Sequence, residues 1–162
     1  MPKFAQDPDV VTLSEAQHWL KELLTEGADC PCCHQFAKKY RRKLNSSMAR
    51  GLIWLVAESG PERAWVEYSK VGPQWLQKIG GTLATLEHWR LIESRENTET
   101  AKRASGIWRP TMLGREFALG EWQIPKYAII YNNRCARLDG DEFGIRDALG
   151  SDFDYEELMK GE

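Results

Sequence analysis

The stretch GGTLATLEHWRLIESRENTETAKRASGIWRPTMLGREFALG, residues 80–120, decides the fold of this chain. Its leucines recur at helical spacing up to Leu91-Ile92, which predicts a helix over residues 82–92. A polar run around residues 99–105 then separates two short segments at 92–98 and 106–110, which we expect to pair as a hairpin. A last short helix follows over residues 111–120, with Met112 and Phe117 among its buried side chains.

The residues before this stretch predict further short elements. Asn45 or Ser46 caps a helix over residues 46–59, which the pair Gly60-Pro61 ends. The segment AWVEYSKVG, residues 64–72, predicts a strand, and PQWLQKIGG, residues 73–81, predicts a second short helix closed by two glycines. Two helices joined by a glycine-containing turn are the arrangement that places the second helix in the DNA major groove. With the hairpin, they predict a winged helix-turn-helix core.

The chain divides by pattern into three segments, and its predicted fold class is α+β. Residues 1–44 should hold a loose arm, a helix capped by Thr12 and Glu15, a cysteine-containing turn, and a basic segment in which Phe36, Tyr40 and Leu44 favour a helix. Residues 45–137 form the winged-helix domain, which ends in a strand within IPKYAIIYNNRCARL. Residues 138–162 form an acidic tail, flexible or weakly helical.

The net charge of −2 hides two basic islands between acidic ends. Residues 36–50 carry six basic and no acidic side chains, whereas residues 138–162 carry two basic and nine acidic ones. A local basic patch is sufficient for phosphate contact, so nucleic acid stays open as a partner. The sequence has no apolar run of membrane-spanning length and no signal-peptide pattern, so we expect a cytoplasmic protein with no membrane partner.

Two resemblances follow from these motifs. LATLEHWRLIE resembles the recognition helix of MarR-like winged-helix proteins, and IWRPTMLGREF resembles their second wing strand and the following helix. Arg90 stands where those proteins usually have glycine, which indicates a different helix end. Over most of its length, through CPCC, FAKKYRRKLNSSMARGLIWL, SGIWRPT and PKYAIIYNN, the chain is similar to a family of small, uncharacterised phage and prophage helix-turn-helix proteins.

Double-stranded DNA is the favoured partner, in a role in transcription or another DNA transaction. The candidate contacts are cations of the basic island, the second helix and the hairpin, together with outward positions of the third helix. They are Lys38, Lys39, Arg41, Arg42, Lys43, Lys78, Thr82, Thr85, His88, Arg95, Lys102, Arg103 and Arg109. The predicted outward face of the third helix holds no arginine, so we expect affinity to come mainly from the hairpin and the basic island.

The cluster Cys30-Pro31-Cys32-Cys33-His34 leaves three interpretations open. Zinc binding needs four ligands, so Cys135, His18, His88 or a second chain would have to complete a site that one such cluster begins. Redox chemistry is suggested by a CPCC motif like that of glutaredoxins, although a helix and not a strand precedes it. Buried or incidental thiols that hold a turn are the third interpretation.

A different class of function is the alternative to DNA binding. The same fold, with its tryptophans and acidic tail, would suit an adaptor or inhibitor that binds a host or phage protein. A homodimer would suit a palindromic DNA site, but the sequence shows no heptad pattern that indicates one. It contains no phosphate loop, HExxH motif or nucleophile elbow, so we predict that the protein is not an enzyme.

Overall fold

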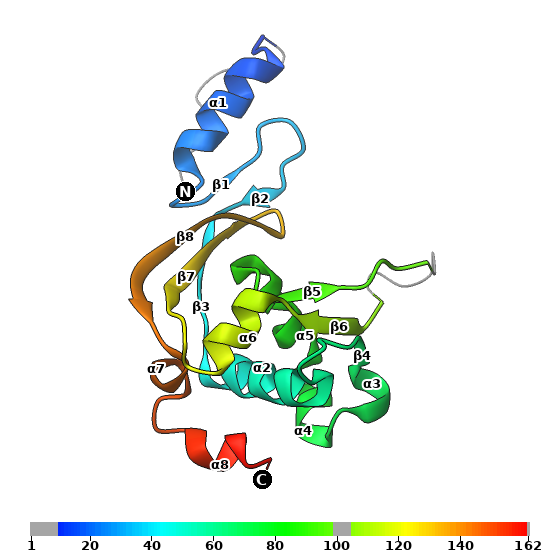
Figure 1. The fold of residues 1–162 in the computed structure, drawn as a ribbon. Helices are drawn as coiled ribbons and strands as arrows, with labels where there is room; N and C mark the ends of the chain where they lie inside the picture. Colours follow the sequence, from blue (N-terminus) through cyan, green and yellow to red (C-terminus); the bar gives the residue numbers. More distant parts are fainter. Residues whose placement is uncertain (1–9, 99–104, 162) are drawn as a thin grey trace. The chain divides into compact units, whose positions relative to one another are not determined.

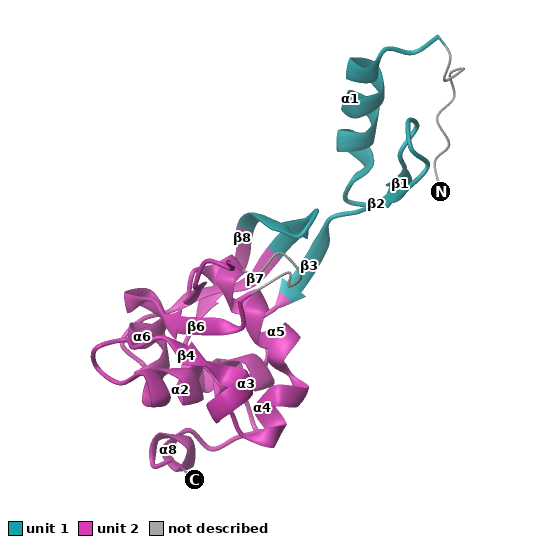
Figure 2. Ribbon diagram, turned by 90° about the vertical axis from the view of Figure 1, so that its right-hand side faces the viewer, with its two compact units in different colours: residues 1–42, 129–137 teal, residues 43–128, 138–162 magenta. Residues whose placement is uncertain are grey.

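The computed structural model describes residues 10–98 and 105–161. The chain forms two compact units: residues 1–42 with 129–137, and residues 43–128 with 138–162 (Figure 2). Both units contain helices and short antiparallel strands (Figure 1), which confirms the predicted α+β class. No helix among the described residues has the length and apolar character needed to cross a membrane.

The first unit begins with the predicted capped helix. Helix α1 (Leu13–Leu23) starts at a capping box: the Thr12 side chain accepts a hydrogen bond from the Glu15 backbone N–H, and the Glu15 carboxylate accepts one from the Thr12 N–H. The carboxylate also accepts from the Thr12 hydroxyl at 2.7 Å, and these bonds lower its pKa. After α1, strands β1 (Ala28–Asp29) and β2 (Phe36–Ala37) pair antiparallel around the cysteine turn.

The helix predicted from Phe36, Tyr40 and Leu44 is wrong. Phe36 pairs with Asp29 in the small hairpin, and Tyr40–Lys43 forms strand β3. A spacing of four residues is also a multiple of two, so the same repeat fits one face of an extended chain. The backbone pairing with other strands decides between the two conformations here.

Strands β3, β7 (Ile124–Tyr131) and β8 (Arg134–Phe143) make a sheet in the order β3-β7-β8. The division between the two units crosses each of these strands. The sequence predicted the first strand of the β7–β8 hairpin but not its turn. Asn132 and Asn133 both adopt positive φ, at 49° and 58°, which is the conformation of a type I′ hairpin turn and one that asparagine tolerates.

The second unit is built around helix α2 (Ser46–Ser59), which the sequence predicted. The Asn45 side chain accepts a hydrogen bond from the Met48 N–H at 3.0 Å and caps it. Leu52 and Leu55 are fully buried, and α2 contacts elements of the unit from β4 to α8 that follow it in the chain. The other elements are β4 (Val66–Glu67), α3 (Tyr68–Val71), α4 (Gln74–Lys78), α5 (Gly80–Ala84), the 3₁₀ helix η1 (Thr85–Trp89), β5 (Ile92–Ser94), β6 (Ile107–Pro110), α6 (Met112–Ala118), α7 (Ile145–Leu149) and α8 (Tyr155–Met159).

The predicted hairpin is confirmed and belongs to a three-stranded sheet of order β4-β6-β5. Val66 lies opposite Trp108 and Ser94 lies opposite Trp108 on its other side. The strand predicted over residues 64–72 is shorter than expected, because the chain turns into α3 at Tyr68, whose ring stacks on Trp108 with centroids 4.6 Å apart. Helix α6 also begins as predicted, although Met112 is exposed and not buried.

The acidic C-terminal segment is more regular than predicted. Leu138–Phe143 continues β8, and α7 and α8 follow it in the second unit (Figure 1). Ile145 and Leu149 are buried, and the Tyr155 hydroxyl donates to the Ala118 carbonyl at 2.8 Å. The segment therefore contributes apolar side chains to the core despite its charge, and most of its described acidic side chains are exposed.

Candidate nucleic-acid interface

The predicted third helix is split into α5 and η1. Leu83, Leu86 and Trp89 are buried at a spacing of three residues, which matches the three residues per turn of a 3₁₀ helix. The most exposed positions follow the same spacing on another side of the helix: Gly81, Glu87 and Arg90 are exposed, with half-buried Ala84 between them. The outward side of this helix therefore carries one anion and one cation.

The three outward positions predicted on this helix are more enclosed than expected. Thr82, Thr85 and His88 are all half-buried. The Thr85 hydroxyl donates a hydrogen bond to the Thr82 carbonyl oxygen at 2.5 Å, and its oxygen lies 3.8 Å from the Met48 sulfur. These side chains form a stripe beside the buried leucines, because a 3₁₀ helix places residues three apart in line.

Arg90 occupies the helix end, the position at which the sequence analysis noted a departure from the glycine usual in MarR-like proteins. It adopts the left-handed conformation, φ 58° and ψ 30°, so it takes the backbone geometry of a glycine cap with a long cationic side chain. The Thr111 hydroxyl donates to the Arg90 carbonyl at 2.6 Å, and the Thr111 N–H donates to the Leu91 carbonyl at 3.0 Å. These bonds tie the helix end to the start of α6 and leave the guanidinium exposed.

Arg109 is engaged within the hairpin. It lies directly opposite Glu93 in the β5–β6 pair, and its Nε donates to the Glu93 carboxylate. Its guanidinium lies over the Trp65 ring, 4.3 Å from the centroid, while Arg63 approaches the same carboxylate at 4.0 Å. Arg95, which directly follows β5, is exposed instead. Lys102 and Arg103, predicted at the hairpin tip, lie outside the described residues.

The basic island does not form one cluster of equal exposure. Arg41, Arg42 and Lys43 are exposed on β3, whereas Lys38 and Lys39 are half-buried. The first unit contains Lys38, Lys39, Arg41 and Arg42, whereas Lys43 belongs to the second. In the second unit, exposed Lys78 ends α4 immediately before α5.

The cysteine cluster forms a closed turn between β1 and β2. The Cys30 N–H donates to the Gln35 carbonyl at 2.8 Å, and the His34 N–H donates to the Cys30 carbonyl at 2.9 Å. His34 adopts a positive φ of 61°. The backbone N–H groups of Cys33 and Cys32 donate to the Cys30 thiol and lower its pKa, whereas desolvation and the neighbouring Cys30 raise the pKa of Cys32. All four cysteines of the chain are free thiols.

The four predicted metal ligands of the turn are close together in sequence. Across residues 10–98 and 105–161, no three side chains of His, Cys, Asp or Glu are grouped to hold a metal ion. His18 pairs with Glu22 on α1, and the Cys135 thiol donates to the Arg137 carbonyl. The predicted ligands Cys30, Cys32, Cys33 and His34 all lie in the turn between β1 and β2, and zinc binding there stays a prediction.

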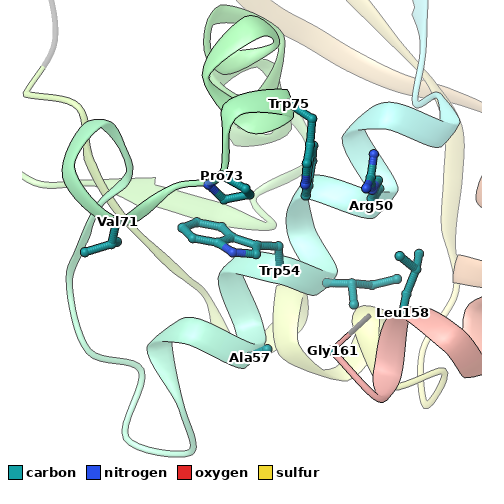
Figure 3. A pocket seen from close by; sticks show the side chains of 9 residues that line it. Arg50, Trp54, Ala57, Val71, Pro73, Trp75, Leu158 and Gly161 are labelled. Carbon is teal, nitrogen blue, oxygen red and sulfur yellow. The ribbon is translucent and has the colours of Figure 1, made fainter.

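A cavity of about 350 Å³ is a feature that the sequence analysis missed. The second unit builds it from α2, α3, α4 and the C-terminal segment, and Figure 3 shows Val71 and Leu158 on opposite sides of it. The Arg50 guanidinium is held between the rings of Trp75 and Phe153, at 3.8 Å and 4.8 Å from their centroids. Its buried Nε–H has no hydrogen-bond partner among the described residues. The lining residues are Arg50, Ile53, Trp54, Ala57, Val71, Pro73, Trp75, Leu158 and Gly161.

Comparison with known proteins finds no family model, curated protein or solved structure that matches the chain. The geometry of its own residues is therefore the basis for a functional assignment.

Proposed function

We propose that the second unit is a winged helix-turn-helix domain that binds double-stranded DNA. The observation that carries this proposal is the sheet order β4-β6-β5 together with the chain order α2, β4, α4, α5–η1, β5–β6. A helix-turn-helix followed by a hairpin that extends from the same small sheet is the arrangement of a winged helix. The family resemblance of the residues at 83–93 and 107–117 supports the same assignment.

Phosphate contact is assigned to the exposed cations that border this helix and hairpin. Lys78 ends α4, Arg90 directly follows η1 and Arg95 directly follows β5, and all three are exposed. Cations against phosphates release counterions, and this sequence-independent term supplies most non-specific affinity. Glu87 lies on the exposed side of η1 and opposes it by repelling phosphate. We therefore expect modest affinity with a low number of phosphate contacts.

The test is a salt titration of binding to a fluorescent duplex of mixed sequence, followed by anisotropy. The logarithm of the binding constant should fall linearly with the logarithm of salt concentration, with a slope of several units. Each of Lys78→Ala, Arg90→Gly and Arg95→Ala should reduce that slope by about 1. Glycine is chosen at position 90 because it retains the left-handed backbone.

Two controls accompany this titration. Lys160→Ala removes an exposed cation from the end of α8 and should leave the slope unchanged. Glu87→Gln should strengthen binding, because it removes an anion from the proposed groove-facing side. Absence of binding at about 50 mM salt, where electrostatic contacts are strong, would overturn the assignment to DNA.

A second candidate function is favoured by the cavity beside Arg50. Its tryptophan walls and its stacked cation suit an aromatic or apolar side chain next to an acidic group on a partner protein. Random peptides selected on the full-length protein, then counter-screened against Trp54→Ala, test this function. Pocket-dependent peptides with an aromatic residue beside Asp or Glu are expected. A selection in which every peptide binds Trp54→Ala equally well would contradict it.

A further inference from the structure

The cysteine turn has the spacing of a zinc-binding turn, but the pair Cys30 and Cys33 supplies two of the four ligands that zinc needs. Cys30 and Cys33 have the Cys-x₂-Cys spacing of a zinc-binding turn, with Pro31 between them. The turn is closed by the two backbone hydrogen bonds on either side of Cys30, and His34 provides the left-handed residue that follows the second cysteine. This local geometry presents both cysteines from a short, constrained loop.

The thiols of the turn are accessible to a metal ion. Zinc is bound by cysteine side chains, so a binding turn has to present their sulfur atoms and not pack them away. A turn that merely packs thiols in a core would instead bury them, whereas Cys32 and Cys33 are exposed and Cys30 is half-exposed.

Within residues 10–98 and 105–161, no further side chain is grouped with this cysteine pair as a metal ligand. The sequence contains four cysteines and three histidines, and the ones outside the turn are Cys135, His18 and His88. No group of three metal-binding side chains forms among the described residues. A structural zinc site is nearly always four-coordinate, so two ligands have to come from elsewhere. A second copy of the chain supplies the same exposed pair.

The hairpin that carries the turn also exposes an apolar ring. Phe36, the first residue of β2, lies three residues after Cys33 and is 50% exposed. An aromatic ring beside a pair of exposed thiols is a surface that gains from being covered. Contact between two copies at this hairpin would bury two such rings around the metal.

We propose that two copies of this protein are joined by one zinc ion held by Cys30 and Cys33 of each chain. The resulting tetrahedral Cys₄ site has its two halves related by twofold symmetry, so each chain contributes identical ligands. Cys32, between the ligands, and Cys135 take no part in the site. This proposal does not depend on DNA binding.

The experiment measures zinc content and native mass on full-length protein, purified without chelator in a non-thiol reductant. We expect half an equivalent of zinc per chain and a species of twice the 18.6 kDa chain mass plus zinc. A chelator should release monomers, and added zinc should restore the dimer. Cys30→Ser and Cys33→Ser should each abolish zinc retention and dimer formation, with circular dichroism and thermal melting confirming that the variants are folded.

Matched variants make the outcome decisive. Cys32→Ser and Cys135→Ser each remove one thiol and should retain half an equivalent of zinc and the dimer. Cobalt(II) added to the metal-free wild type should give the absorption of a tetrahedral thiolate site, and in Cys33→Ser it should not. One zinc per chain, a monomer without zinc, or a dimer that persists in chelator or is linked by a disulfide would each overturn the proposal.

Discussion

Gly114 packs directly against the backbone of Leu91: a Cβ atom at position 114 would lie 1.8 Å from the Leu91 carbonyl oxygen. The same carbonyl accepts the Thr111 N–H, so the start of α6 is fixed on the residue that follows the left-handed Arg90. The end of η1, the first strand of the hairpin and α6 therefore meet at this point. Only glycine fits there without a backbone shift.

Gly114→Ala should destabilise the protein by about 3 kcal/mol or more, because the obstructing atom is backbone and not a flexible side chain. The control is Gly81→Ala on α5, where a Cβ would meet nothing within 4 Å. That substitution should raise stability by about 0.5–1 kcal/mol through helix propensity. Urea denaturation measures both values. Equal effects of the two substitutions would contradict the close approach of α6 to Leu91.

Leu149 tests whether the acidic C-terminal segment is part of the core. It is 1% exposed at the end of α7, which contacts α2. Leu149→Ala should therefore lower the free energy of unfolding by about 2–5 kcal/mol, the range for a buried leucine. Met159→Ala, at a residue 43% exposed on α8, should change it by less than about 0.5 kcal/mol. A loose tail would give equally small effects at both positions.

The sequence predicted those elements whose local signals agree with their packing. The Thr12 and Asn45 caps and the hairpin were predicted correctly, because each depends on residues within a few positions. The pair Gly80-Gly81, which was expected to form a turn, instead begins helix α5. Strand β3 was not predicted, since the repeat at 36, 40 and 44 fits a helix as well as a strand. Pairing with a distant segment selects the strand.

The candidate site shows the same limit. Sequence reasoning identified Arg109 as a cation of the hairpin, but its pairing with Glu93 depends on strand register. The cavity beside Arg50 combines residues 50–57, 71–75 and 158–161, and no local pattern indicates that these meet. The composition of the tail predicted exposure, whereas a few buried apolar residues, Ile145 and Leu149 among them, fix it to the domain. Charge content alone does not reveal such a minority of core residues.

The Glu93–Arg109 pair should contribute to the hairpin and respond to salt. The side chains are 42% and 31% exposed, so solvent screens their attraction. A double-mutant cycle with Glu93→Gln and Arg109→Gln should give a coupling free energy of about 0.5–1 kcal/mol at low salt. At about 1 M salt, where the screening length is short, the coupling should largely disappear. The measurement is urea denaturation of the four proteins at both salt concentrations.

The cycle also separates two roles of Arg109. If its main role is to pair with Glu93, then Arg109→Gln should change DNA affinity less than Arg95→Ala, whose side chain is exposed on the same hairpin. A larger loss of the salt slope for Arg109→Gln than for Arg95→Ala would assign Arg109 to phosphate contact.

Tyr155 should make the stability of the folded state fall at alkaline pH. Burial raises its pKa above the ordinary value of about 10, and the neighbouring Arg146 partly offsets this by lowering it. The folded state therefore favours the neutral phenol, which also donates to the Ala118 carbonyl. For an acid whose folded pKa is raised, the stabilisation is complete below the unfolded pKa and is lost as pH rises through the folded pKa.

The wild type should thus lose stability above about pH 10 more steeply than Tyr155→Phe, which has no ionisable phenol at this position. At pH 7 the wild type should be the more stable of the two proteins, because the variant lacks a hydrogen bond worth about 1 kcal/mol. Urea denaturation of both proteins at a series of pH values between 7 and 11 measures the difference, in which the titration of shared lysines and tyrosines cancels. Parallel curves over this range would show that the Tyr155 phenol titrates alike in the folded and unfolded chain, and would contradict its burial against α6.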